Sequence, residues 1–104
     1  MESVGFFVIV PGKDSLSAFN SAINTTIYDK NEYRALSIFN GIPLSSLNRE
    51  EKLTYAELLL HSSKHIEGYS WIVDTDGPAA CVSLGPSEKH DDLIDYLFFG
   101  WSVD

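Results

Sequence analysis

The sequence has little cysteine and few basic residues, and both shortages exclude classes of protein. Cys81 is the single cysteine among 104 residues, so the chain cannot form an internal disulfide. A small domain without disulfides fits a reducing compartment. Lysine and arginine together number 7 against 15 acidic residues, which gives a net charge of −8. A chain with this balance is not expected to bind nucleic acid directly.

The chain also lacks an apolar run long enough to cross a membrane. The run Val4–Val10 is far shorter than the roughly 20 residues that a membrane-spanning helix needs. It is preceded by Glu2 and by no basic residue, and no small-residue cleavage pattern follows it. These features argue against a signal peptide. We therefore expect a cytoplasmic protein that does not contact a membrane.

The residues that are present indicate one folded domain. Hydrophobic residues make up 44% of the chain and aromatic residues 12%, as in globular proteins and not in disordered ones. A chain of this length can bury about two-thirds of its unfolded surface around one core. We find no internal repeat and no linker, so residues 1–104 are expected to form a single α+β domain.

The stretch Gly68–Gly85 predicts a β-hairpin at the centre of the sheet. Its two arms, Tyr69–Val73 and Ala79–Leu84, are rich in β-branched, aromatic and small apolar residues, and Asp74–Pro78 supplies turn residues between them. Neither arm alternates cleanly with polar residues, which favours a central pair of strands. A two-stranded ribbon is not stable alone, so further strands and helices must cover it.

Two further strands are expected near the ends of the chain. Val4–Val10 is a short apolar run with too many β-branched and aromatic residues for a good helix. Tyr96–Val103 has a similar aromatic density, and we expect a strand there too. The residues Leu93, Leu97 and Trp101 also satisfy helical spacing, so a helix stays open as an alternative.

Two segments have the apolar spacing of amphipathic helices. The first begins after Asp14 or Ser15, either of which can cap it, and its apolar positions are Leu16, Phe19, Ile23 and Ile27. The second carries the clearer signal. It begins at Asn48, which precedes a glutamate by three residues in a capping-box relation, and it should extend to about Ser63.

A third helix is expected over Tyr33–Phe39, ended by Gly41, although a strand fits this segment nearly as well. Ile42–Leu44 should be extended because Pro43 disfavours helical geometry in the residue before it. Ser87 is expected to cap a helical turn through His90–Asp92. Together these elements predict about three helices packed on one face of a mostly antiparallel sheet of about four strands.

Charge is distributed unevenly along the chain. Residues 1–64 contain seven acids and six bases, whereas residues 65–104 contain eight acids and Lys89 as their single base. Such an asymmetry concerns partners and not the fold, because a strongly negative surface steers basic molecules toward it. Solubility alone is the alternative explanation.

The histidines and the cysteine, which could act as metal ligands or as a nucleophile, lack the neighbouring residues that these roles require. His61 and His65 have the spacing of a helical metal pair, but no glutamate lies between them as in a zinc-hydrolase helix. Cys81 lies in an apolar run, which favours a buried thiol over a nucleophile. We therefore predict no catalytic residue, no metal and no cofactor, and a protein that is not an enzyme.

Acidic and aromatic side chains in the C-terminal part of the chain are the candidates for binding a partner. If the predicted hairpin brings them to one side, aromatic anchors would be ringed by steering carboxylates, as in interfaces that capture a basic protein. The predicted acidic members are Asp74, Asp76, Glu88, Asp91, Asp92 and Asp95. The predicted aromatic members are Tyr69, Trp71, Tyr96 and Trp101.

The sequence thus predicts a small acidic protein that inhibits a basic protein partner. The most concrete hypothesis is an immunity protein that neutralises a nuclease toxin by blocking its positively charged groove. One alternative is a phage-type inhibitor that mimics nucleic acid and occupies a host defence protein. Another is a small ligand-binding or enzyme domain that uses a helix–sheet pocket with His61, His65 or His90. The oligomeric state is left open, and the apolar segment Leu93–Trp101 is a possible interface.

Overall fold

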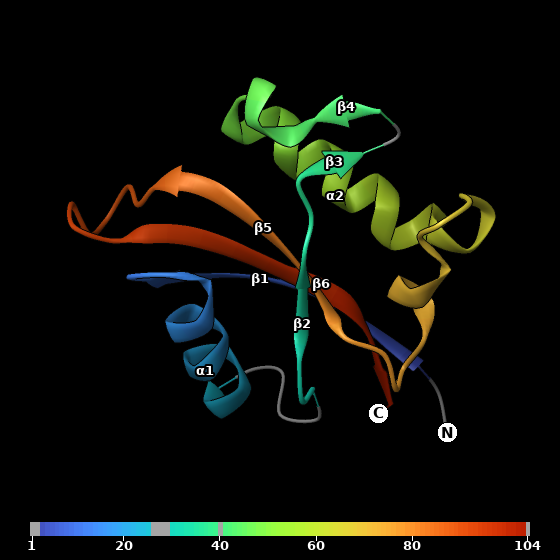
Figure 1. Cartoon of the computed structure of the whole chain (residues 1–104). Coiled ribbons are helices and arrows are strands. Elements are labelled where there is room, and N and C mark those ends of the chain that lie inside the picture. Colours follow the sequence, from blue (N-terminus) through green and yellow to red (C-terminus); the bar gives the residue numbers. More distant parts are fainter. Residues whose placement is uncertain (1–2, 26–29, 40, 104) are drawn as a thin grey trace.

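The computed structural model describes residues 3–25, 30–39 and 41–103, and it has the predicted α+β class (Figure 1). Its main sheet has four strands in the order β1-β6-β5-β2. These strands are β1 (Ser3–Gly12), β6 (Ile94–Val103), β5 (Ala79–Pro86) and β2 (Tyr33–Ala35). The β1–β6 and β6–β5 pairs are antiparallel, and β2 is parallel to β5. A second, two-stranded sheet pairs β3 (Ile38–Phe39) with β4 (Ile42–Pro43).

The helices of the described chain are two α-helices and three short 3-10 helices. The α-helices are α1 (Ser15–Thr25) and α2 (Arg49–Ser62). The 3-10 helices are η1 (Leu44–Ser46), η2 (Ser63–His65) and η3 (Ser70–Val73). The prediction of about three helices is therefore replaced by two α-helices and three single turns.

The central hairpin is formed by β5 and β6, and not by the two arms predicted from the sequence. Ala79–Leu84 is a strand as predicted, but its antiparallel partner is β6. Tyr69–Val73 is not a strand, because its backbone forms local bonds from Ile72 N–H to the Tyr69 carbonyl and from Asp74 N–H to the Trp71 carbonyl. The ten-residue strand β6 pairs with β1 on one side and with β5 on the other. It therefore takes the place beside β5 that was predicted for Tyr69–Val73.

The two α-helices cover opposite faces of the sheet, which corrects the prediction that the helices share one face (Figure 1). Along β6, Phe98 belongs to a core with Ala18 and Phe19 of α1. Its neighbours Leu97 and Phe99 point the other way, because successive side chains of a strand alternate between faces. They belong to a second core with Leu59 and Leu60 of α2 among its members. The continuous apolar run in β6 therefore serves two cores.

The helix α1 begins where its predicted cap lies. The Ser17 N–H donates to the Asp14 carboxylate at 2.8 Å, and this bond lowers the pKa of Asp14. The helix lies very close to the end of β1, where a Cβ atom on Gly12 would come within 2.7 Å of the Ala18 nitrogen. Glycine is therefore required at this junction. The predicted position Ile27 lies outside the described residues.

The capping box of α2 is confirmed in both directions. The Glu51 N–H donates to the Asn48 side chain at 2.9 Å, and the Asn48 N–H donates to the Glu51 carboxylate at 3.0 Å. The helix ends at Ser62, next to the predicted end. The capping box thus fixes where α2 begins, and the first residue of the helix, Arg49, is placed beside the β5–β6 connection.

The predicted helix over Tyr33–Phe39 is wrong, and the strand alternative is confirmed. Its first half is β2, which pairs with Ala79–Cys81 of β5. Its second half is β3, which forms a small ribbon with β4, as expected for an extended segment at Pro43. The ring of Phe39 packs 5.3 Å from that of Tyr55 on α2. The ribbon thereby lies over the helix, and packing across the chain overrides the local helical pattern.

Candidate functional site

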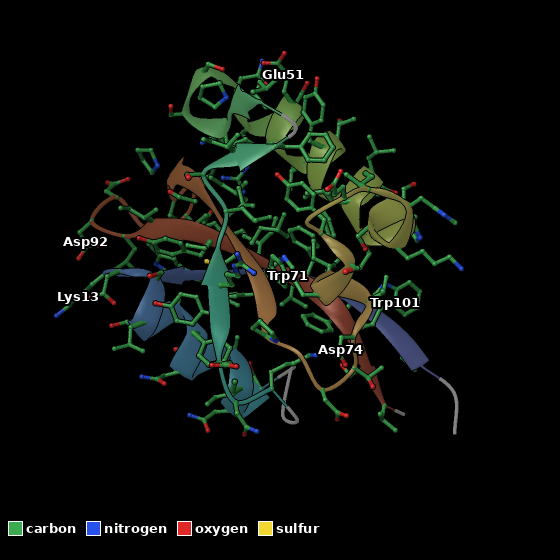
Figure 2. All side chains as sticks on the ribbon, turned by 45° about the vertical axis from the view of Figure 1, so that its right-hand side comes forward. Lys13, Glu51, Trp71, Asp74, Asp92 and Trp101 are labelled. Carbon is green, nitrogen blue, oxygen red and sulfur yellow. The ribbon has the colours of Figure 1, made fainter. Side chains whose placement is uncertain are left out.

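The ten candidate residues divide between the two ends of the main sheet. Asp74 and Asp76 precede β5, whereas Glu88, Asp91 and Asp92 follow it. Strand β5 has eight residues, which at about 3.3 Å each separates the groups by roughly 25 Å. Figure 2 accordingly places Asp74 and Asp92 far apart. The predicted hairpin was expected to bring these carboxylates to one side of the molecule, and the structure instead places them at opposite ends of β5.

The connection between β5 and β6, residues 87–93, carries several acidic residues, and hydrogen bonds hold its backbone in place at Ser87. Ser87 is buried, and its hydroxyl accepts hydrogen bonds from the N–H groups of Lys89 and His90. The Ser87 N–H donates to the Leu93 carbonyl at 2.9 Å. Ser87 thus has the capping role predicted for it, although residues 90–92 form a turn and not a helix. We use the name acidic loop for the exposed residues Glu88, Asp91 and Asp92.

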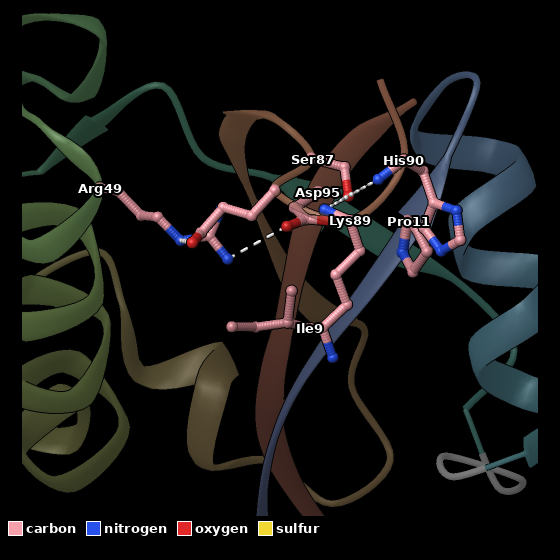
Figure 3. A pocket seen from close by; sticks show the side chains of 8 residues that line it. Ile9, Pro11, Arg49, Ser87, Lys89, His90 and Asp95 are labelled. Carbon is pink, nitrogen blue, oxygen red and sulfur yellow. Dashed lines mark hydrogen bonds and ion pairs between the residues drawn. The ribbon is translucent and has the colours of Figure 1, made fainter. Parts of the chain in front are cut away.

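Arg49 ties this loop to the start of α2 (Figure 3). Its Nε atom lies 3.0 Å from a carboxylate oxygen of Glu88, and its Nη2 atom lies 3.1 Å from one of Asp95. Asp95 is only 7% exposed, so its carboxylate is engaged inside the molecule. Asp95 was predicted to bind a partner, but the structure places its carboxylate against Arg49 and not at the exposed surface. Arg49 also neutralises part of the negative charge that the sequence concentrates after residue 64.

A groove of about 440 Å³ lies between the acidic loop, the end of β1 and the start of α2 (Figure 3). Its lining includes Pro11, Arg49, Lys89 and His90. Two of these residues are cationic, and the carboxylates of Glu88 and Asp95 also line the groove. The charges in the groove are therefore mixed, and the excess of negative charge lies on the exposed loop beside it.

The aromatic candidates Tyr69 and Trp71 lie at the other end of the sheet. The Tyr69 hydroxyl donates to the Ile38 carbonyl at 3.0 Å, and the Trp71 indole N–H donates to the Gly68 carbonyl at 3.1 Å. The guanidinium of Arg34 lies 4.9 Å from the Trp71 ring, which is the geometry of a cation–π contact. These residues line a second groove of about 330 Å³. They do not adjoin the acidic loop.

The remaining aromatic candidates point to opposite faces of β6. The Trp101 indole N–H donates to the Leu60 carbonyl at 2.9 Å, and its ring meets that of His61 edge to face. Tyr96 packs against the α1 core. A single binding surface cannot contain both rings, so the predicted acid-and-aromatic patch is not brought together.

The turn that carries Asp74 and Asp76 is held from inside by Lys30, which the sequence analysis missed. The Asp76 N–H donates to the Asp74 carboxylate at 3.0 Å, which is ordinary turn chemistry. Lys30 is only 3% exposed, and its ammonium donates to the carbonyls of Thr75 and Gly77 at 3.1 and 3.0 Å. A lysine in a polar stretch gives no sequence signal for such burial.

Replacing Lys30 by methionine should loosen this turn. The variant keeps the apolar stem but removes the donor from two carbonyls, so we expect the free energy of unfolding to fall by about 1 to 2 kcal/mol. Hydrogen exchange should quicken at residues 74–78 more than in β5. Lys64→Met is the matched control, since Lys64 is exposed and its loss should change stability by less than about 0.5 kcal/mol. Equal effects of the two variants would contradict the anchoring role of Lys30.

The side chains that were considered for chemistry have different surroundings in the structure. Cys81 is buried, and burial raises the pKa of its thiol to about 12, so the thiol stays protonated at neutral pH and is a poor nucleophile. His61 contacts Trp101, and His65 is exposed at the end of η2. Within residues 3–25, 30–39 and 41–103, no three histidine, cysteine, aspartate or glutamate side chains gather closely enough to hold a metal ion.

Comparisons with protein-family models, with curated proteins and with solved structures find no match for this chain. None of the helices in the described residues has both the length and the apolar character needed to cross a membrane. The geometry and charge of the chain itself are therefore the basis for inferring its function.

Proposed function

We propose that this chain is a small acidic binding protein that inhibits a basic protein partner. In its most concrete form, the proposal is a cytoplasmic immunity protein that neutralises a nuclease toxin by covering the positively charged groove of the toxin. The observation that carries the proposal is the acidic loop, in which three carboxylates are exposed on a turn whose backbone is hydrogen-bonded to Ser87.

The contacts that hold this loop in place matter because ordering a flexible loop on binding costs free energy. Ser87 holds the backbone of the loop, and Arg49 ties Glu88 to α2 at 3.0 Å. The carboxylates of Asp91 and Asp92 are therefore presented from a support that is ordered before a partner arrives. This arrangement supports recognition of a cationic surface.

A nuclease suits this chemistry because it must attract the phosphates of its substrate with basic side chains. The net charge of −8 would steer such a protein toward the chain over long range. The carboxylates of the acidic loop would then compete with phosphate for the same basic groups. A mimic of nucleic acid that blocks another DNA- or RNA-binding protein uses the same chemistry, and the identity of the partner separates the two.

Neutralising Asp91 and Asp92 together, as Asp91→Asn with Asp92→Asn, should slow association with the partner. Exposed charges at the rim of an interface change the association rate more than the dissociation rate, so we expect the association rate constant to fall about three- to tenfold at low salt. The loss should shrink at about 0.5 M salt, where screening is strong. Stopped-flow or surface-plasmon measurements at two salt concentrations give both rates.

The matched control for this pair is Glu32→Gln with Glu57→Gln. It removes the same charge from two exposed positions outside the loop, so its effect on the association rate constant should be clearly smaller. An equal loss in both double variants would contradict a specific role of the loop and leave only the overall charge.

The partner itself can be sought by affinity purification of the tagged chain from its native cells at low and moderate salt. The proposal expects a basic protein with a nuclease domain that stays bound at moderate salt and is inhibited by the purified chain. A retained DNA- or RNA-binding protein without nuclease activity would select the mimic. If no partner survives moderate salt, the inhibitor proposal fails.

A further inference from the structure

One long edge of the main sheet is open. Strand β1 pairs with β6 along all ten of its residues, and in the described part of the chain no strand pairs with its other side. The opposite edge of the sheet is different, since β2 has only three residues and carries Arg34. The outer side of β1 therefore presents a row of backbone donors and acceptors.

Up to Val10, the composition of β1 gives this edge none of the usual protection. Natural edge strands are blunted by charged residues, prolines or bulges, but Ser3–Gly12 contains no charged residue and its first proline is Pro11. Large apolar side chains are exposed along it, with Val4 44%, Phe7 37% and Ile9 41% exposed. Such an edge is suited to pairing with another strand.

We propose that the β1 edge binds a second copy of this chain, and that the two β1 strands pair antiparallel about a two-fold axis at Phe7. Pro11 has no N–H and ends the usable ladder, so the pairing segment is Val4–Val10, whose central residue is Phe7. Val4 of one copy then faces Val10 of the other, and Phe7 faces Phe7. Every opposed pair is uncharged, and the segment is complementary to itself, as a two-fold interface requires.

The charge of the molecule restricts where and in which orientation two copies can meet. Two copies that each carry −8 repel, so the repulsion is smallest when they meet through an uncharged surface and keep their acidic residues apart. The acidic loop lies at the Gly12 end of β1, since Gly12 pairs with Ile94 just after the loop. Antiparallel pairing places this end beside Ser3 of the other copy. The two acidic loops therefore lie at opposite ends of the joined sheet, where their mutual repulsion is smallest.

The resulting dimer has a continuous eight-stranded sheet, because each copy contributes its four-stranded sheet. Both acidic loops stay exposed, so the dimer could bind two partners at once. The inference does not depend on the proposed function, since it uses the backbone edge of β1 and not the carboxylates of the loop.

The test uses the fact that residue 7 faces itself across the axis. Sedimentation equilibrium of the unchanged chain from about 1 to 200 μM should show the mass rising toward twice that of the monomer. Phe7→Lys and Phe7→Glu should each be monomeric over this range, because like charges would face each other across the two-fold axis. An equimolar mixture of the two variants should again sediment as a dimer, because lysine then faces glutamate.

Several outcomes would overturn the proposal. One is a monomer at every concentration of the unchanged chain, and another is a dimer that persists in both single variants. A third is a mixture that stays monomeric although circular dichroism shows that both variants are folded. If the variants do not fold, hydrogen exchange of the unchanged chain decides. Protection of β1 amides must then rise with protein concentration, and concentration-independent exchange there contradicts pairing through this edge.

Discussion

Replacing Phe98 by alanine should lower the free energy of unfolding by about 3 to 5 kcal/mol, as for other fully buried phenylalanines. Phe98 has no exposed surface, and its ring packs 5.7 Å from that of Phe19 and 5.9 Å from that of Tyr33. The other members of this core are mostly small, such as Ala18 and Ala22, so they cannot fill the space. The melting temperature should fall by roughly 15 °C or more. Calorimetry and urea denaturation measure both quantities.

The substitution tests whether both faces of the sheet are buried. Phe99→Ala should cost a similar amount, because Phe99 is equally buried on the α2 side. Phe98→Leu keeps most of the apolar volume and should cost only about 1 kcal/mol. If Phe98→Ala were nearly neutral while Phe99→Ala was severe, the helices would lie on one face of the sheet, and the assignment of α1 to the other face would be wrong.

The parts of the fold that follow local rules could be predicted from the sequence. The capping box at Asn48 depends on a contact between residues three apart, and α2 begins where it predicts. The strand β1 and the helix α1 could likewise be predicted from the apolar pattern of their own residues. Each of these elements has a boundary set by chemistry within a few positions of the chain, and a sequence contains that information directly.

The pairing of strands could not be read in the same way. Tyr69–Val73 has strand-like composition, but β6 takes the antiparallel place beside β5 that was predicted for it, since β6 pairs with Ala80–Pro86. The side of the sheet chosen by each helix is also a property of the whole chain. Leu97, Phe98 and Phe99 are consecutive and all buried, which indicates that both faces of the strand are covered. No local rule says which helix covers which face.

The sequence correctly predicted that the cluster of Glu88, Asp91 and Asp92 is exposed to solvent, and the structure places the three on one loop. What failed was the treatment of acidic residues as alike. Asp95 follows Asp92 by only three positions, yet it lies on a strand and is buried against Arg49. The contact joins residues 46 positions apart in sequence numbering (49 to 95). No spacing rule links residues so distant, so charge counted along the chain overestimates the charge presented in space.

The acidic loop and the β1 edge divide the surface into two kinds of chemistry. The loop offers exposed carboxylates, which act over long range and weaken as salt rises. The edge offers backbone hydrogen bonds and apolar side chains, which need direct contact and respond little to salt. High salt should therefore weaken capture of a basic partner while leaving, or even favouring, association of two copies that repel one another. The two surfaces can thus be separated in one titration.

Replacing Asp95 by alanine should lower the free energy of unfolding by about 2 to 4 kcal/mol. Removing one member of a buried ion pair leaves the other charge without compensation, which costs about 3 to 5 kcal/mol when burial is complete. The side chain of Arg49 is 28% exposed, so water recovers part of that cost. Glu88 still lies 3.0 Å from the Nε atom of Arg49, so the guanidinium keeps one carboxylate. Its Nη2 atom loses its partner, and its Nη1 atom is already buried without a hydrogen-bond partner among the described residues. Urea denaturation at neutral pH measures the loss.

Asp92→Ala is the control, because Asp92 is exposed on the loop three residues earlier and its loss should change stability by less than about 0.5 kcal/mol. Substitutions at the two sites should then change different quantities, stability at Asp95 and the association rate at Asp92. Asp95→Ala should lower stability and leave the association rate with a basic partner nearly unchanged, whereas neutralising Asp91 and Asp92 should slow association at constant stability. Arg49→Met combined with Asp95→Leu should regain most of the lost stability, since an apolar pair carries no desolvation cost. If Asp95→Ala instead slowed association and left stability intact, Asp95 would face the partner, and Arg49 would not be its essential counterion.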